Sequence, residues 1–372
     1  MPVDPSWAGR TYPESGPYLV DGARLREFAV AVGTAAPACF DPAAAQALGY
    51  ADVVAAPTFA AVIAQQAEAQ YVRDPAAGID FARVVHAEES FEHHRPIVAG
   101  DRLWAALTVK SIVERAGIAM VTTQVALHDA VRRPVATVVS TLAVRGEPVT
   151  MRAEDKVTDG SGRTLAGAGA QRRPGAVPGV AYPVTGAGGV APDTFPPVTS
   201  AQGVAPGTSS PVAAAQGVAP GSSSAVAEVR RAPAQAGDRI GPVSVALTRA
   251  DLGLYADASG DHNIIHRDDQ AAREVGLPGV IAHGMLTMGR AVQLLVDWAG
   301  PDPGAVERYT ARFARPVPVP PDGSAELAVA GEVVAVAGDA ATVNLVVTLD
   351  GHKVLGKTQA VVRPRSADPA GS

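Results

Sequence analysis

One long stretch near the middle of the chain has a composition that no compact fold can use. Over residues 174–227 the only charged residue is Asp193, and glycine, proline, serine, threonine, alanine and valine dominate. A 14-residue repeat runs through 201–227. Regular proline and glycine prevent helices and sheets, and the apolar side chains are too small to build a core. The sequence therefore predicts a flexible linker over 152–238, which divides the chain into two globular parts.

The two parts have similar predicted elements. The chain has 372 residues, of which 47% are apolar, enough for two domains of ordinary size. Each part has one helical stretch, 58–71 in the first and 284–298 in the second, followed by runs of β-branched residues. A helix followed by an antiparallel meander is an α+β pattern, in which the sheet can wrap around the helix. The expected domains are 1–151 and 239–366, followed by a disordered tail over 367–372.

The composition also excludes several classes of protein. A net charge of -6 argues against nucleic-acid binding, which normally requires a basic face. No stretch of about 20 uncharged apolar residues reads as a membrane span, and the first residues lack the pattern of a signal peptide. Cys39 is the single cysteine, so an internal disulfide is impossible and a reducing compartment fits. We therefore expect a soluble, cytoplasmic protein.

An internal duplication relates the two parts. A shift of 227 positions aligns residues 28–59 with the second part without gaps, and nine of these 32 positions are identical. Alanine-rich sequences match by chance, so two glycines, one aspartate and the aromatic residue at the start carry most of the weight. The pattern indicates two copies of one fold. The weighted pairs are Phe28 with Tyr255, Gly33 with Gly260, Asp41 with Asp268, and Gly49 with Gly276.

The alignment fails at the residues that can move protons. Every polar group that could do chemistry in the second copy is replaced in the first, and one replacement is a proline, which has no backbone N–H to offer. This pattern predicts one working copy and one silent copy. The mismatched pairs are Asp261 with Thr34, Asn263 with Ala36, His266 with Cys39, His283 with Ala56, and Gly284 with Pro57.

The densest polar cluster of the second part lies in 255–271, where Gly-Asp-His-Asn-Ile-Ile-His ends at His266. A glycine-rich turn then leads into His-Gly at the start of the predicted helix. This combination resembles the signature of the MaoC-like, hydratase 2 family. Ile264 stands where that family usually has proline, but the spacing from Asp to His is intact. The resemblance implies a hot-dog domain, an antiparallel sheet wrapped around a central helix.

The chemistry of that family requires these residue types. Removing water from a 3-hydroxyacyl thioester takes away an α-proton and protonates a departing hydroxyl, so an acid and a base must lie close together. A backbone N–H at a helix start can stabilise the enolate-like oxygen. The resemblance implies that Asp261 and His266 form the dyad, with His266 as the base we favour. It further implies that Asn263 positions the dyad and that Gly284 donates to the oxyanion, while His283 either positions the dyad or caps the helix.

Motifs of the first part have a resemblance of their own. Phe-Ala-Val-Ala-Val from Phe28, Arg-Val-Val-His ending at His86, and His-Arg-Pro-Ile from His94 resemble the non-catalytic subunit of heterodimeric (3R)-hydroxyacyl-ACP dehydratases of mycolic acid elongation. The second part resembles their catalytic subunit. The chain thus resembles a fusion of the two, with the hot-dog domains paired edge to edge inside one chain.

That resemblance implies a substrate and a partner. The substrate is an acyl-ACP or acyl-CoA thioester, the macromolecular partner is an acyl carrier protein, and neither a cofactor nor a metal is expected. The small residues at the silent positions Thr34, Ala36 and Ala56 would leave room for a long acyl chain. Further assembly into a homo-oligomer stays open.

Each singled-out residue also has a simpler interpretation. Asp261 after a glycine can be a turn or helix-capping residue, and His266 can be a surface histidine. Asp261, His262, His266 and Asp268 are dense enough to suggest a metal, but we expect His262 to point away from His266. Cys39 is expected to be a packing thiol rather than a nucleophile. The histidines of segment 91–96 are assigned to the start of a strand.

Three other functions remain open on this fold. An (R)-specific enoyl-CoA hydratase would use the same dyad. A non-catalytic acyl-binding hot-dog protein would have no need of Asp261 and His266, and a thioesterase would have no need of this Asp-x-Asn-x-x-His loop.

Overall fold

The computed structural model describes residues 3–77, 79, 84–115, 117–145 and 233–364. The predicted tail and all of the predicted linker except 233–238 lie outside the described residues. The described strands are β1 (Ser15–Leu19), β2 (Val84–His93), β3 (Arg102–Arg115), β4 (Ile118–His128), β5 (Pro134–Arg145), β6 (Arg239–Leu247), β7 (Val306–Phe313), β8 (Ala325–Ala337), β9 (Ala340–Leu349) and β10 (His352–Val362).

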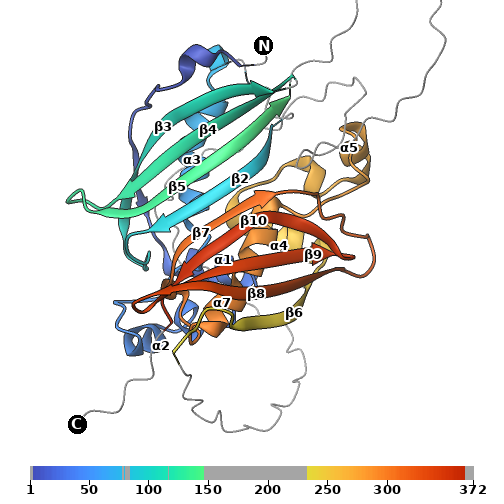
Figure 1. The fold of residues 1–372 in the computed structure, drawn as a ribbon. Coiled ribbons are helices and arrows are strands. Elements are labelled where there is room, and N and C mark those ends of the chain that lie inside the picture. The colour runs from blue at the N-terminus through green and yellow to red at the C-terminus, as the bar shows by residue number, and fades with distance from the viewer. Residues whose placement is uncertain (1–2, 78, 80–83, 116, 146–232, 365–372) are drawn as a thin grey trace, which may run out of the picture. The chain divides into compact units, whose positions relative to one another are not determined.

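These strands form one antiparallel sheet in the order β1-β3-β4-β5-β2-β7-β10-β9-β8-β6. The first part supplies the strands up to β2 and the second part those from β7 onward, so the two meet where β2 pairs with β7 (Figure 1). This confirms the prediction of two hot-dog domains joined edge to edge within the chain. The ladder between them runs from Glu88 opposite Arg312 to Glu92 opposite Arg308.

The helices repeat in the same way. Every helix within 22–47, whether an α-helix (α) or a 3-10 helix (η), has a counterpart 227 residues later. This confirms the duplication over that range. Gly33 and Gly260 both have a positive φ, 65° and 82°, at the ends of the paired helices, a conformation that glycine adopts without strain. The helices are α1 (Gly22–Ala31), η2 (Pro37–Cys39), α2 (Pro42–Ala47), α3 (Ala60–Val72), α4 (Arg249–Ser259), η5 (Ile264–His266), α5 (Asp269–Glu274), α6 (Gly284–Ala291) and α7 (Gln293–Trp298), with the short η1 (Pro5–Trp7), η3 (Pro75–Ala77) and η6 (Pro303–Ala305).

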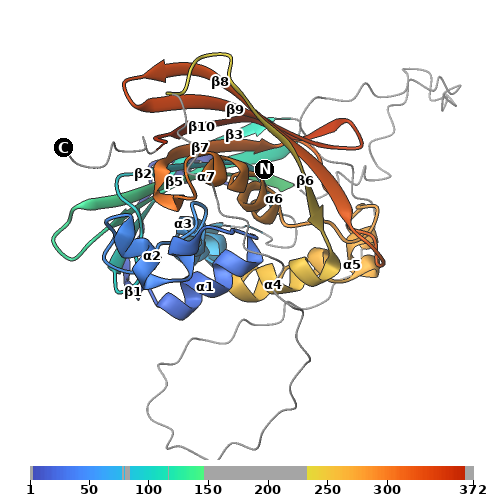
Figure 2. The same ribbon diagram turned by 90° about the horizontal axis from the view of Figure 1, so that it is seen from below.

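The central helices of both parts lie on one face of the sheet (Figure 2). The helix predicted over 58–71 is α3, and the one predicted over 284–298 is divided into α6 and α7 around Val292. Helices α1 and α4 lie side by side, and Phe28 of α1 packs against Tyr255 of α4 with ring centroids 5.9 Å apart. The two copies therefore share one apolar core.

One local prediction was wrong. The segment 91–96 is the end of a strand rather than its start, because β2 ends at His93. Its counterpart in the second part also follows a strand, since β7 ends at Phe313. Proline cannot donate to a strand ladder, so it bounds a strand equally well at either end. Among the described helices, none has the length and apolar character needed to cross a lipid bilayer.

A close approach between the two copies yields a stability prediction. A Cβ added at Gly289 of α6 would lie 2.8 Å from Val32 Cγ1 and 3.0 Å from Thr58 Oγ1, both in the first part. We expect Gly289→Ala to lower the free energy of unfolding by about 1–3 kcal/mol through overpacking. Gly253→Ala in α4, where nothing lies within 4 Å, should raise it by about 0.5–1 kcal/mol through helix propensity. Denaturant titration of both variants measures this, and equal gains would contradict the close approach.

Candidate active site

Asp261 lies where helix α4 gives way to a loop. Gly260 ends α4 in the left-handed conformation, and this turns the chain toward the central helix α6. The backbone N–H of Asp261 donates to Ser259 Oγ over 3.1 Å, and its carboxylate accepts from the backbone N–H of Asn263 over 3.2 Å. The carboxylate is thus held by its own loop.

His266 ends the 3-10 helix η5 and is buried, with 8% of its surface exposed. Asn263 caps that helix, its side-chain oxygen accepting from the backbone N–H of Ile265 over 3.3 Å. The ring Nδ1 of His266 lies 2.8 Å from the carbonyl oxygen of Ile281, and a carbonyl can only accept. Nδ1 therefore carries the hydrogen, and Nε2 is left with a lone pair whenever the ring is neutral.

His283 stands at the N-cap position of α6, but its side chain makes no capping hydrogen bond. Its Nε2 instead donates to the backbone carbonyl of Asp261 over 3.1 Å. The ring is 1% exposed and lies 3.8 Å, centroid to centroid, from the ring of His266. Of the two roles foreseen for His283, the geometry favours holding the Asp261 loop against α6 over capping.

Gly284 begins α6, where the first backbone N–H groups of a helix have no partner within it. A Cβ at this position would lie 2.9 Å from a ring carbon of Phe313. Only glycine therefore lets the helix start come this close to strand β7. The silent copy has Pro57 at the matching position.

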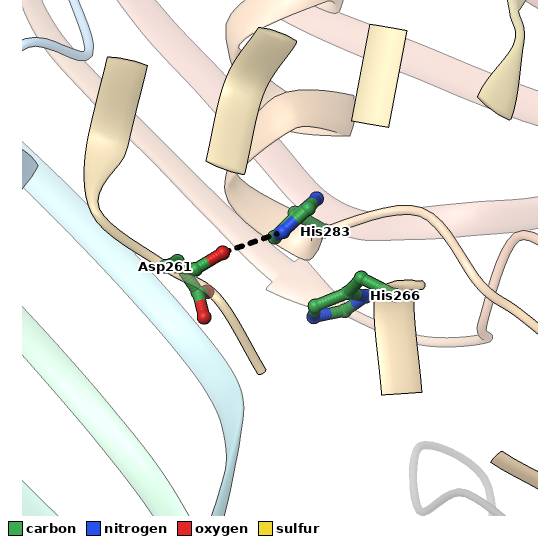
Figure 3. A group of neighbouring side chains, drawn as sticks. All are labelled: Asp261, His266 and His283. Carbon is green, nitrogen blue, oxygen red and sulfur yellow. Dashed lines mark hydrogen bonds between the residues drawn. The ribbon is translucent and has the colours of Figure 1, made fainter. Parts of the chain in front are cut away.

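Asp261, His266 and His283 converge (Figure 3). Each offers one nitrogen or carboxylate oxygen, and these atoms all lie within 4.8 Å of one another. The sequence foresaw two of the three as the dyad. His262, placed in the same cluster by the metal alternative, is exposed, and Asp268 caps α5. The spacing of the converging groups suits either proton transfer or a bound cation.

Burial and charge act in opposite directions on these groups. Burial lowers the pKa of His266, while the Asp261 carboxylate and the Ile281 carbonyl raise it to a lesser extent. Burial, reinforced by the neighbouring His266, lowers the pKa of His283 to about 4. Burial alone would raise the pKa of Asp261, but the charges of His266, His283 and His86 together outweigh it, so the pKa is lowered. At neutral pH the site therefore holds a carboxylate beside neutral imidazoles.

The positions of the first copy that align with the candidate site are buried. Thr34, Ala36 and Ala56 are all buried, and the cavity beside Ala56 has a volume of about 20 Å³, room for one water molecule. The cavity beside Ala56 is thus too small for a long acyl chain. Cys39 is buried, and burial raises its pKa to about 12, which confirms a packing thiol rather than a nucleophile.

Two residues near the site were missed as site residues. His86 of β2 lies 6.5 Å, ring to ring, from Phe313, and Tyr255 of α4 lies 5.0 Å from His283. The sequence held a weak signal for His86, which stands in a strand motif of the first part, but no pattern showed that it faces the second part.

Comparison with known proteins agrees with this architecture. The model of the FAS1-like, dehydratase domain region matches residues 6–138, and the model of the MaoC like domain matches residues 232–350. A UPF0336 protein of Clavibacter michiganensis subsp. michiganensis is 48% identical over 147 residues, which are 40% of this chain and 99% of that protein.

Solved structures extend the likeness to both parts. A MaoC-like dehydratase is 28% identical with a TM-score of 0.70, covering 97% of this chain and 99% of that one. A conserved hypothetical protein of Mycobacterium tuberculosis with a double hot-dog fold is 15% identical with a TM-score of 0.56, covering 95% of each chain, and shows the fold alone. The chain therefore belongs to the MaoC-like double hot-dog family, with a first part of the UPF0336 kind.

Proposed function

We propose that this chain is a (3R)-hydroxyacyl-ACP dehydratase, which reversibly removes water from a 3-hydroxyacyl thioester to give the trans-2-enoyl thioester in fatty acid or mycolic acid elongation. Its MaoC-like domain supports a hydro-lyase kind of activity. The observation that carries the finer proposal is the convergence of the Asp261 carboxylate and the His266 imidazole in one buried site beside the start of α6.

The resting charges suggest the path of the proton. Neutral His266 takes the α-proton on Nε2, because Nδ1 is committed to the Ile281 carbonyl. The Asp261 carboxylate stabilises the imidazolium that forms. The pair then returns this proton to the hydroxyl oxygen as its bond to the β-carbon breaks, so water leaves and the site regains its starting charge. Both groups lie on one side of the substrate, which makes the elimination syn.

The start of α6 serves the thioester carbonyl. When the α-proton leaves, negative charge builds on the carbonyl oxygen, and a backbone N–H at a helix N-terminus stabilises it. Gly284 is placed to donate that hydrogen bond, and the absence of a side chain lets the carbonyl approach. In the silent copy, Pro57 has no N–H to donate.

Each of the three segments of the chain has a role in the proposed reaction. Residues 239–366 carry the reaction, residues 1–151 complete the paired fold, and residues 152–238 tether the two. The acyl carrier protein is the proposed macromolecular partner, and the pairing of β2 with β7 supports a shared site between the halves.

Hydration of crotonyl-CoA, followed by loss of the enoyl absorbance, tests the dyad. We expect Asp261→Asn and His266→Ala each to lower kcat/KM by about 100-fold or more, the usual contribution of a general acid or base. Cys39→Ala is the matched control, because it alters the position in the silent copy that corresponds to His266, and it should retain wild-type activity.

Two outcomes would contradict the assignment. If the Asp261 and His266 variants hydrate crotonyl-CoA as fast as wild type, the dyad is elsewhere. If wild type shows no turnover with either carrier while it binds acyl thioesters, the chain is an acyl-binding protein rather than an enzyme.

A chelator separates proton transfer from metal chemistry at the same three side chains. Prolonged dialysis against EDTA should leave kcat/KM unchanged, because the proposed steps use only Asp261, His266 and a backbone N–H. Loss of activity on dialysis and its return with a divalent cation would identify the cluster as a metal site instead.

The carrier is tested with matched acyl chains. We expect a higher kcat/KM for an enoyl-ACP than for the CoA thioester of the same acyl group, because the carrier protein adds its own contacts. An equal or lower value with the carrier protein would favour the (R)-specific enoyl-CoA hydratase.

A further inference from the structure

Strand β2 of the first part contains an irregularity next to the site of the second part. Its pairing with β5 shifts register between His86 and Glu88, so Ala87 is the extra residue of a β-bulge. Bulges next to active sites redirect a side chain, because an extra residue reverses which side chains face inward.

The reversal turns His86 toward the interior. Before the bulge, His86 is opposite Leu142, which is 3% exposed. After it, Glu89 is opposite Ser140 and Phe91 is opposite Val138, and these four residues are also buried. Inward positions thus fall on even numbers before Ala87 and on odd numbers after it. Without the bulge, the position of His86 would face outward.

The second part contains the same bulge. The pairing of β7 with β10 shifts register between Val306 and Arg308, which makes Glu307 the extra residue. The segments His-Arg-Pro and Ala-Arg-Pro that follow the two strands align Ala87 with Glu307, and His86 with Val306. The duplication therefore includes the bulge but gives its inward residue a different side chain in each copy.

Val306 shows where that inward residue goes. It lines the small cavity of the silent copy together with Ala56 and Pro57, the counterparts of His283 and Gly284. Val306, the inward residue before the bulge of the second part, thus reaches the site position of the first part. By the same relation, His86, the inward residue before the bulge of the first part, reaches the site of the second part.

The contacts of His86 agree with this relation. Its ring meets Phe313 edge to face at 6.5 Å and 78°, and Phe313 is the side chain that packs against Gly284. Burial and nearer groups have the larger effects on the pKa values of Asp261 and His266. The interaction with His86 makes a smaller contribution, which lowers both pKa values.

We infer that His86 is a positioning residue for the active site, supplied across β2 and β7 by the copy that lacks a dyad, and that it acts through its contact with Phe313 beside Gly284. The catalytic role of His86 rests on the proposed function, whereas its placement beside the site does not. The other titratable or charged groups facing the pair or flanking His86 are His283 at the start of α6, Tyr255 of α4, Glu89 of β2, and the ion pair of Glu88 with Arg312.

The test replaces His86 with the residue found in the other copy. We expect His86→Val to lower kcat/KM for crotonyl-CoA hydration about 10-fold through lost positioning, and to move the acid limb of the pH profile to higher pH, because the contribution of His86 that lowers the pKa values of Asp261 and His266 is gone. His86→Lys, which places a positive charge at the same position, should leave the acid limb near its wild-type position. His94→Val replaces an exposed histidine just past the same strand and should match wild type.

A second measurement does not depend on turnover. The imidazole of His266, followed by NMR across a pH titration, should titrate at higher pH in His86→Val than in wild type, and unchanged in His94→Val. Identical titration in wild type and His86→Val would overturn the inference, whatever the activity. A shifted titration in a protein that does not hydrate enoyl thioesters would uphold the placement of His86 and reject the proposed function instead.

Discussion

The backbone ladder between β2 and β7 is the contact on which the rest of the molecule depends. It joins two five-stranded sheets into one, and it aligns the central helices of both copies on the same face. The first residues of each of these strands are thereby brought toward the helix start of the other copy, as Val306 is beside Pro57. Since backbone hydrogen bonds fix register to one residue, the ladder determines which side chains reach across. Neither half contains every residue that lines its own site.

The first copy keeps its place in the fold with other side chains at the positions aligned with the proposed site, namely Thr34, Ala36, Cys39 and Ala56. Pro303, Gly304 and Val306 of the second part bound the small cavity beside Ala56. Tyr50 donates to Asp302 over 2.7 Å and packs against Gly304. A buried polar group without a partner is costly, so small apolar residues such as Ala36 and Ala56 are stable at these buried positions. In the second copy, hydrogen bonds join His266 to the Ile281 carbonyl and His283 to the Asp261 carbonyl.

Much of the fold and of the candidate site could be predicted because the signals are local. Asp261 and His266 stand five residues apart on one loop, and Gly33 and Gly260 occupy turns that require a positive φ. The features that were missed depend on pairing between distant segments. The inward direction of His86 arises from the bulge at Ala87, which no alternation of apolar residues predicts. The small size of the cavity beside Ala56 also depends on distant segments, because Pro303, Gly304 and Val306 of the second part help to bound it.

The ends of the sheet have a consequence of their own. The outermost strands are β1 and β6, whose outer edges have no partner strand among the described residues, and an unpaired edge is a template for another chain. Each of them contains a proline, Pro17 in one and Pro242 in the other, which withholds a backbone donor from any incoming strand. Both copies therefore have a proline in their edge strand. This proline hinders the addition of further strands, and so counters fibre formation by a long sheet that is rich in valine and alanine.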